Sequence, residues 1–572
     1  MSGYNVISFL GLFVLMFLAW LMSEDRQRFP WRVVIWGISL QIVFGFVVLF
    51  WEPGAKFFLK LNDVFNALLA FSEEGATFVF NSVGSSASTG HIPLTLKEYL
   101  TRLGQTSTDP LIQLAIKTGT VPGFFFAFQV LTTIIFFSAL LSVLYYLGIM
   151  QKIVLLFAKI MERTMRVSGA ESLSNSANIF VGQTEAPLVV RPYIESMTRS
   201  ELMAIMVGGF ANTAGGVLGA YVMMLSGYFP NIASHLISAS LLSAPAAFIF
   251  AKIMVPEKES PLTMGEVKME VEIQDANVLD AAANGTTVGW QLAINVAAML
   301  VSFVALIAMA NLGVSAIGDL LHNRMGVIRF DLMLGAAVLA LLIVWKRGRA
   351  PNDVLVWSML AGVAVLAAVS YAAMDNTTAK LITGVAISAW FPLFLQCDRP
   401  KPFGPPLLLT LIAIGVIANV GVLMAGPLAP DTKLSLQLIL GWFHWPIAVM
   451  MGVPPQDALS IGKLLGEKLI LTEFIAYIDL SNILGAVGRG EMPALDPRSI
   501  VIVSYALCGF SNFASIAIQI GGIAPMAPSR RGDLAKLGFK AMVAGSLATY
   551  MIACVAGMFY NGPSMLGIAP SP

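Results

Sequence analysis

Long apolar runs are the feature that most constrains the fold of this chain. A helix that crosses a bilayer needs about 20 apolar residues, and runs of this length recur from the N-terminus to the C-terminus. Only 12% of the 572 residues are charged and 57% are hydrophobic, so the chain cannot build the charged shell of a soluble protein. The apolar content excludes a disordered chain, and the net charge of +1 argues against a nucleic-acid-binding protein. The sequence therefore predicts an all-α polytopic membrane protein.

Charged residues between the apolar runs predict how the chain threads through the membrane. No basic residue precedes the first run, whereas Arg26, Arg28 and Arg32 follow it, so we interpret this run as an anchored helix that begins outside. When the later runs alternate in direction, the basic clusters at 346–349 and 398–401 fall inside, as the positive-inside rule requires. We count twelve spans, which predicts a multi-pass protein of the cytoplasmic (inner) membrane with both termini outside. The predicted spans are 6–22, 33–51, 124–149, 202–224, 232–254, 290–312, 332–345, 354–373, 379–395, 406–425, 500–523 and 541–559.

The spans and the segments between them divide the chain into five regions. A polar stretch at 256–289, with balanced charge, predicts a cytoplasmic linker in the third region. The fourth region is a block of four spans with no polar motif inside them. The regions are 1–170 (N-terminal spans, interfacial helix and scaffold), 171–254 (first hairpin, broken helix and a span), 255–328 (linker and scaffold span), 329–433 (inserted four-span block) and 434–572 (interfacial segment, second hairpin, broken helix and last span).

The segment 171–197 is too short and too polar to span the membrane. Its centre is the polar sequence GQTEAP, bracketed by the helix breakers Gly182 and Pro187. The 11 residues before this centre give about 16 Å of helix, half the thickness of a bilayer core. The charges on both sides of the segment are predicted to be cytoplasmic. We therefore predict a re-entrant hairpin that enters the membrane from the inside.

The segment 456–485 has the same design. Two short arms flank a polar centre at Thr472 and Glu473. Since the preceding span ends outside, this second re-entrant hairpin is predicted to enter from the outside.

Each predicted hairpin is followed by a span with a small, polar interruption. The interruptions are GGFANTAGG at 208–216 and CGFSNFAS at 508–515. A hairpin with a broken helix thus occurs twice, once from each membrane face. This is the pattern of an inverted-repeat secondary transporter, whose binding site lies near mid-membrane between discontinuous helices. Backbone groups freed at that depth are tolerated where they line a cavity.

Two carboxylates at the predicted hairpin tips are the first candidate binding groups. Glu185 and Glu473 are expected near mid-membrane, where each charge costs at least about 2.5–3.5 kcal/mol and commonly marks a substrate or ion path. An ionised carboxylate can accept two hydroxyl hydrogen bonds at once, as the vicinal hydroxyls of a sugar offer. The alternative is a structural carboxylate that caps a helix.

Amide, hydroxyl and aromatic groups accompany these carboxylates. Gln183 and Thr184 offer donors and acceptors suited to the edge of a heterocycle. Asn512 and Ser515 are three residues apart, so a helix would place them on one face. Phe510 would pack in the core by default, but beside Asn512 it could stack on a planar ligand.

Neutral oxygens near the first tip and the first break could bind a small, hard cation. Candidates are the side-chain oxygen of Asn178, the backbone carbonyl of Val181, and Asn212 and Thr213. An asparagine in a membrane helix more often joins neighbouring helices, and this alternative stays open. Three scattered cysteines and four dispersed histidines predict neither a disulfide framework nor a zinc site, and we expect no cofactor.

These motifs resemble the concentrative nucleoside transporter family. The resemblance is most specific at 182–202, 208–221, 473–477 and 508–522, and it extends over 1–327 and from 434 to the C-terminus. It implies a homotrimer whose protomers each carry eight core spans and two hairpins of opposite orientation. The block 329–433 is an addition to the usual bacterial pattern, with no role that the resemblance implies.

The resemblance also implies a role for each candidate residue. Asn212 stands where Ser or Thr is usual, and Thr472 stands where Asn usually precedes the tip glutamate. Gln183, Thr184 and Glu185 would read the nucleobase, Val217 and Phe510 would flank it, Glu473, Asn512 and Ser515 would hold the ribose, and Asn178, Val181, Asn212 and Thr213 would bind sodium as the coupling ion.

The sequence thus predicts a sodium-coupled nucleoside importer. Proton coupling through Glu185 or Glu473 is the alternative, and the presence of Asn178 favours sodium. An intramembrane enzyme would need a nucleophile with a base or a metal, but no histidine falls in a hairpin or a break and no HExxH or GxSxG pattern lies in the spans. A passive channel is disfavoured because groups gathered at two tips suit stoichiometric binding. Purine against pyrimidine preference stays open.

Overall fold

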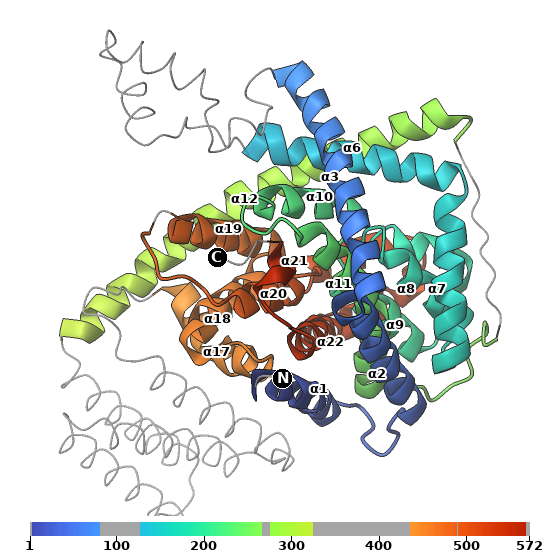
Figure 1. The fold of residues 1–572 in the computed structure, drawn as a ribbon. Coiled ribbons are helices and arrows are strands. Elements are labelled where there is room, and N and C mark those ends of the chain that lie inside the picture. The colour runs from blue at the N-terminus through green and yellow to red at the C-terminus, as the bar shows by residue number, and fades with distance from the viewer. Residues whose placement is uncertain (1–2, 81–125, 266–274, 324–434, 489, 568–572) are drawn as a thin grey trace, which may run out of the picture. The chain divides into compact units, whose positions relative to one another are not determined.

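The fold is seen in a computed structural model that describes residues 3–80, 126–265, 275–323, 435–488 and 490–567. Every element in these ranges is a helix (Figure 1), which confirms the predicted all-α class. The chain divides into two compact units, one formed by 1–303 with 467–572 and the other by 304–466. The predicted four-span block at 329–433 lies outside the described residues.

The described helices follow the predicted spans closely. Within the described residues, seven helical stretches are long and apolar enough to cross a membrane, so the chain is a multi-pass membrane protein. The uninterrupted ones are α1 Gly3–Leu21, α2 Trp31–Gly45 with its π-helical continuation η1 Phe46–Phe50, α6 Phe126–Tyr146, α11 Ile232–Met254, α12 Val278–Asn323 and α22 Arg531–Met558.

Helices α11 and α22 form the centre of the larger unit. Both are buried almost along their whole length, whereas α1, α2 and α6 keep an apolar face exposed. A helix that is apolar all round needs neighbours on all sides: α11 packs against α2 and α22, and α22 packs against α1. The exposed apolar side chains of α1 and α2, such as Phe17 and Trp31, suit contact with lipid.

Two amphipathic helices accompany the spans. Helix α3 covers Glu52–Phe80 and α7 covers Ile149–Met165. Helix α7 buries Val154, Ala158 and Met161 at helical spacing and packs against α2. Helix α7 therefore turns one apolar face inward.

Helix α12 begins 12 residues before the predicted span at Trp290. The segment before Trp290 is polar, which predicts a linker, but a side-chain cap at Asn277 starts the helix there. The Oδ1 atom of Asn277 accepts the backbone N–H groups of Leu279 and Asp280, each at 3.0 Å. A capped start followed by an alanine run favours a helix over a linker, so the linker predicted at 256–289 is helical from Val278 onward.

The smaller unit contains α17 Leu436–Met450 and the beginning of α18 Pro455–Ile470. These two helices approach closely through glycines. A Cβ atom on Gly462 would lie only 2.6 Å from the carbonyl oxygen of Gly441. Ser435 caps α17 by accepting the Leu438 N–H at 3.2 Å.

Candidate functional site

The first tip is a seven-residue turn between two short helices. Helix α8 covers Gly169–Asn178 and the 3-10 helix η4 covers Ala186–Ser196, so residues 179–185 form the tip. Although α8 is rich in serine and asparagine, every one of its residues is buried. A polar helix that is enclosed in this way must satisfy its polar groups within the protein.

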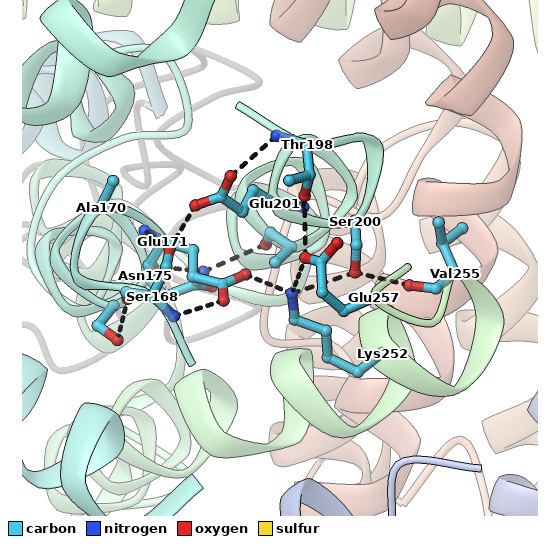
Figure 2. Close-up of polar contacts among 12 residues, drawn as sticks. Ser168, Ala170, Glu171, Asn175, Thr198, Ser200, Glu201, Lys252, Val255 and Glu257 are labelled. Carbon is cyan, nitrogen blue, oxygen red and sulfur yellow. Dashed lines mark hydrogen bonds and ion pairs between the residues drawn. The ribbon is translucent and has the colours of Figure 1, made fainter. Parts of the chain in front are cut away.

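A buried polar network holds the N-terminal end of α8 (Figure 2). Ser168 and Glu171 form a capping box at the start of α8, and Thr198 and Glu201 form another at the start of α9. The Ser168 hydroxyl donates to Glu201 Oε1 at 2.5 Å and thereby joins the two boxes. Both S-x-x-E and T-x-x-E patterns are visible in the sequence, but the link between them is not.

Lys252 of α11 lies at the centre of the network (Figure 2). Its ammonium is 2.7 Å from Glu171 Oε2 and 3.5 Å from Glu257 Oε2, and it donates to the Ser200 hydroxyl at 3.1 Å. The lysine and Glu171 are both almost fully buried. The ion pair joins α11 to α8, and the hydrogen bond to Ser200 joins the same lysine to α9.

Both predicted broken helices are broken. Helix α9 Arg199–Ala211 is separated from α10 Gly215–Leu225 by residues 212–214. Helix α20 Pro497–Ala506 is separated from α21 Phe513–Ile523 by residues 507–512. The first tip touches the first break, because the Gly215 N–H donates to the Phe180 carbonyl at 3.0 Å.

The two breaks lie against each other. The Gly509 N–H donates to the Thr213 hydroxyl at 2.8 Å, and the Ser511 hydroxyl donates to the Phe210 carbonyl at 2.8 Å. Gly509 has φ +99°, and a Cβ atom there would lie 2.6 Å from the Ala211 carbonyl oxygen. Glycine is therefore required at this crossing.

A cavity of about 410 Å³ opens beside the crossing. Its size falls within the range of about 300–1,000 Å³ usual for small-molecule sites. All of the residues that the sequence analysis assigned to substrate binding line it: Gln183, Thr184, Glu185, Val217, Glu473, Phe510, Asn512 and Ser515. The fold thus gathers residues from both tips and both broken helices around one space.

Glu473 is held rigidly at the second tip. Only Leu471 and Thr472 separate α18 from α19 Glu473–Gly488. The Glu473 carboxylate accepts the Tyr221 hydroxyl hydrogen at 2.9 Å and an amide hydrogen of Asn512 at 3.1 Å. Each carboxylate oxygen therefore already has one partner, and lone pairs remain for a ligand.

The amide of Gln183 is fixed by the opposite broken helix. Its Nε2 donates to the Ser515 hydroxyl at 3.2 Å, and its Oε1 accepts from Gln519 Nε2 at 3.0 Å. Glu185 differs from Glu473 because its side chain is exposed to the cavity. Its carboxylate lies against Gly182, where a Cβ atom would overlap it.

Asn512 and Ser515 lie close together, as predicted, but not as two residues on one face of a helix. Asn512 is the N-cap of α21, and its Oδ1 accepts the Ser515 N–H at 2.9 Å. The two side chains are neighbours through a cap rather than through a helical face.

The four candidate cation ligands lie at the end of α8, the first tip and the first break, and they differ in their hydrogen bonds. The Thr213 hydroxyl accepts from the second break, and Asn212 Oδ1 accepts the Thr213 N–H at 3.1 Å. The Nδ2 of Asn178 is buried without a hydrogen-bond partner. Rotating this amide would put an oxygen in the same place, and a buried oxygen without a donor suits a cation. The remaining candidate, Val181, lines the cavity.

Several cavity residues and supporting groups were not predicted. Tyr221 and Gln519 were missed because only the folded structure shows that they bond Glu473 and Gln183. Gln519 follows Ser515 by four residues, so its place on the same helical face was the one available signal. Thr472 of the second tip also lines the cavity, and further polar residues come from α6 and α12: Ser138, Ser142, Tyr145 and Asn284.

Comparison with known families agrees with this geometry. A family model described as "Na+ dependent nucleoside transporter C-terminus" matches residues 235–387 and 406–557. The corresponding N-terminal model matches residues 10–83, and a model described as "Nucleoside recognition" matches residues 127–228. Together these matches include both broken helices, the first tip and the second tip.

Similar proteins occur in bacteria and mammals. The uncharacterized transporter YutK of Bacillus subtilis is 32% identical over 551 residues, which cover 96% of this chain and 98% of the relative. Solute carrier family 28 member 3 of Mus musculus is 31% identical over 567 residues, which cover 98% of this chain and 59% of the relative.

Solved structures of CNTnw are similar over nearly the whole chain. The inward-facing, substrate-bound state has a TM-score of 0.66 and 32% identity, and covers 97% of this chain and 98% of that one. An outward-facing CNTnw variant has a TM-score of 0.66 and 31% identity, with 98% of each chain covered. The family resemblance seen in the hairpin and break motifs is confirmed: the chain belongs to the concentrative nucleoside transporter family, whose members carry nucleosides across membranes.

Proposed function

We propose that this protein is a sodium-coupled symporter that imports nucleosides across the cytoplasmic membrane. The observation that carries the proposal is the cavity, around which eight candidate residues from four separate segments gather. Its polar groups come from both tips, with Gln183 and Glu185 on the first tip and Glu473 on the second. A nucleoside has a flat base and a hydroxylated sugar, and these two parts need different polar partners.

The sugar is proposed to bind at Glu473. Tyr221 and Asn512 hold this carboxylate in place, while its remaining lone pairs can accept hydroxyl hydrogens. Hydrogen bonds to a charged acceptor are about twice as strong as neutral ones. Ser515 and Asn512 would supply further contacts from the same side.

The base is proposed to bind between Val217 and Phe510, with its edge facing the first tip. Ser515 and Gln519 hold the Gln183 amide in one orientation. The remaining donor and acceptor positions of this amide therefore have fixed directions. Thr184 and Glu185 would read the same edge. An amide, a hydroxyl and a carboxylate can serve purines and pyrimidines alike.

Sodium is proposed as the coupling ion, held by Asn178, Val181, Asn212 and Thr213. These residues offer neutral oxygens without a carboxylate, a set that suits a hard cation of single charge. Because the Phe180 carbonyl bonds the first break, an ion here would fix the first tip in the position from which Gln183 meets the base. Among solved relatives, CNTnw is described in inward-facing and outward-facing states, which supports alternating access.

The membrane arrangement is also part of the proposal. The two tips would belong to re-entrant hairpins of opposite orientation in an inverted repeat, with both termini outside and three protomers in the assembly. Cross-linking and light scattering of the purified protein would test the trimer.

An ion-dependent uptake panel tests the function. Proteoliposomes containing the full chain are given labelled uridine or adenosine under an inward sodium gradient, a pH gradient or no gradient. We expect uptake that follows the sodium gradient. Uptake that follows the pH gradient and ignores sodium would establish proton coupling instead, and no uptake of any nucleoside would overturn the proposal.

A further inference from the structure

A second deeply buried lysine lies next to the candidate site. Lys468 precedes Glu473 by five residues and is 1% exposed. Its ammonium donates to the Ala506 carbonyl at 2.8 Å, to the Cys508 carbonyl at 3.0 Å and to the Thr549 hydroxyl at 2.8 Å. All three hydrogens are therefore used within the protein.

The Lys468 ammonium caps the C-terminal end of α20, where the second broken helix is interrupted. Ala506 is the last residue of α20, and Cys508 follows it in the break. Carbonyl groups at the end of a helix lack partners within the helix and carry partial negative charge. A fixed cation at this position satisfies both carbonyls and favours the break.

The surroundings of Lys468 differ from those of the other buried lysine. Lys252 contacts the carboxylates of Glu171 and Glu257 directly (Figure 2), whereas the three hydrogen bonds of Lys468 all go to neutral oxygens. A buried charge persists only if an opposite charge or strong polar groups compensate it. The same break joins Lys468 to the proposed sugar-binding group: the ammonium donates to the Cys508 carbonyl, and Asn512, four residues later, donates to the Glu473 carboxylate at 3.1 Å.

The two breaks share a sequence pattern but not this lysine. GGFAN at 208–212 matches CGFSN at 508–512. The residue that matches Ala506 is Met206, which lies inside α9, and its carbonyl accepts a neutral amide hydrogen from Gln519 at 3.1 Å. The Ala506 carbonyl, at the end of α20, accepts from an ammonium instead. The second break is therefore contacted by a lysine at a position where the first half has a neutral amide.

We propose that Lys468 is a fixed internal cation that serves the second tip as a bound ion serves the first: it holds the end of α20 and the break that follows, from which Asn512 positions Glu473. The second tip can then bind sugar hydroxyls without recruiting an ion. Lys468 is thus a positioning residue, and this inference rests on the proposed function of the cavity.

Discrimination between sugars tests the proposal. The full-length protein in nanodiscs is titrated with uridine and with 2′,3′-dideoxyuridine, which lacks the hydroxyls that Glu473 would bind. Because charged hydrogen bonds discriminate strongly, we expect Lys468→Met to lower the preference for uridine by about tenfold. Lys468→Arg keeps the charge and should keep most of the preference.

Thr549→Val is the matched control, since it removes one neutral acceptor of the same ammonium and leaves the charge. Its preference should stay within about twofold of the wild type, the change expected from one weak neutral bond. An unchanged preference in Lys468→Met, or an equal loss in Lys468→Met and Lys468→Arg, would overturn the proposal.

A replacement variant and a wild-type control complete the test. If Lys468→Met does not fold, the comparison of Lys468→Gln with Lys468→Arg replaces it, because both side chains are polar and only arginine is charged. The wild type separates this inference from the proposed function. A wild-type protein that binds neither nucleoside contradicts the function of the cavity, whereas a wild type that prefers uridine leaves Lys468 to be judged on its variants.

Discussion

The two tips share a sequence design, with two short arms around a polar centre that carries a glutamate, but they differ in structure. The first is a seven-residue turn whose Glu185 is exposed to the cavity, whereas the second has only Leu471 and Thr472 between helices and buries Glu473. Glu473 is fixed by Tyr221 and Asn512. Two similar tips thus hold their carboxylates differently: one is fixed by neighbouring side chains, and the other is exposed to the cavity.

Replacing the fixed carboxylate should have the largest effect. Glu473→Gln keeps the side-chain size, but its amide nitrogen would present hydrogens to one of the two donors, Tyr221 or Asn512. Losing charged hydrogen bonds and leaving one buried donor unpaired costs about 3 kcal/mol or more. We expect kcat/KM for uridine uptake to fall by at least about a hundredfold, measured in proteoliposomes. Uptake close to the wild type would show that Glu473 does not hold the sugar.

Replacing the exposed carboxylate should have a smaller effect. Glu185→Gln disturbs no buried partner, since the side chain is exposed to the cavity. We expect a loss of about tenfold in kcat/KM, which corresponds to about 1.4 kcal/mol. The same uptake assay measures it. If Glu185→Gln proves more damaging than Glu473→Gln, the contrast between the tips is reversed.

The crossing of the breaks can be tested through stability. Gly509→Ala would force a side chain into a left-handed backbone, 2.6 Å from the Ala211 carbonyl oxygen. We expect the free energy of unfolding to fall by about 1–3 kcal/mol, seen as a lower Tm. Gly75→Ala is the matched control because its Cβ atom meets nothing within 4 Å and alanine favours a helix. A Tm loss equal in both variants would mean that the crossing is not constrained.

The smallest expected effect lies in the loop that anchors α9. Glu24 accepts hydrogen bonds from Arg199 at 3.0 Å and Lys540 at 2.8 Å, and its pKa falls to about 2, chiefly through Arg199. A lowered folded-state pKa gives stability that is present above the unfolded value of 4.5 and is lost as the pH falls toward 2.

Because this cluster is partly exposed, the contribution should be below about 1 kcal/mol. Glu24→Gln should therefore lose a little stability at pH 7 and show a flatter Tm decrease between pH 5 and pH 3. Parallel wild-type and variant curves over this pH range would show that Glu24 contributes nothing.

Much of the architecture was predictable because it rests on local patterns. Apolar runs predicted the spans, and the glycine-rich polar interruptions predicted the breaks near Asn212 and Asn512. The eight residues assigned to the substrate were placed by motif, and the fold brings all of them to one cavity. The start of α12 was not predicted because the stretch 256–289 is polar and suggested a linker, although Asn277 within it caps the helix.

The supporting groups could not be predicted because they depend on contacts distant in sequence. Tyr221 reaches Glu473 across 252 positions, and Gln519 reaches Gln183 across 336. Lys468 reaches the end of α20 across 38 positions, a contact that only the fold shows. Periodicity identifies the elements, but it does not identify which buried polar groups pair.

Sodium-coupled nucleoside binding in this cavity can be measured without transport. Uridine is titrated at equilibrium into the purified full chain in sodium and in choline buffers of equal ionic strength. We expect a Kd that is at least about tenfold lower in sodium, a difference of about 1.4 kcal/mol, with binding lost in Glu473→Gln. Equal affinity in both buffers would contradict the sodium coupling, and no binding in either would contradict the site itself.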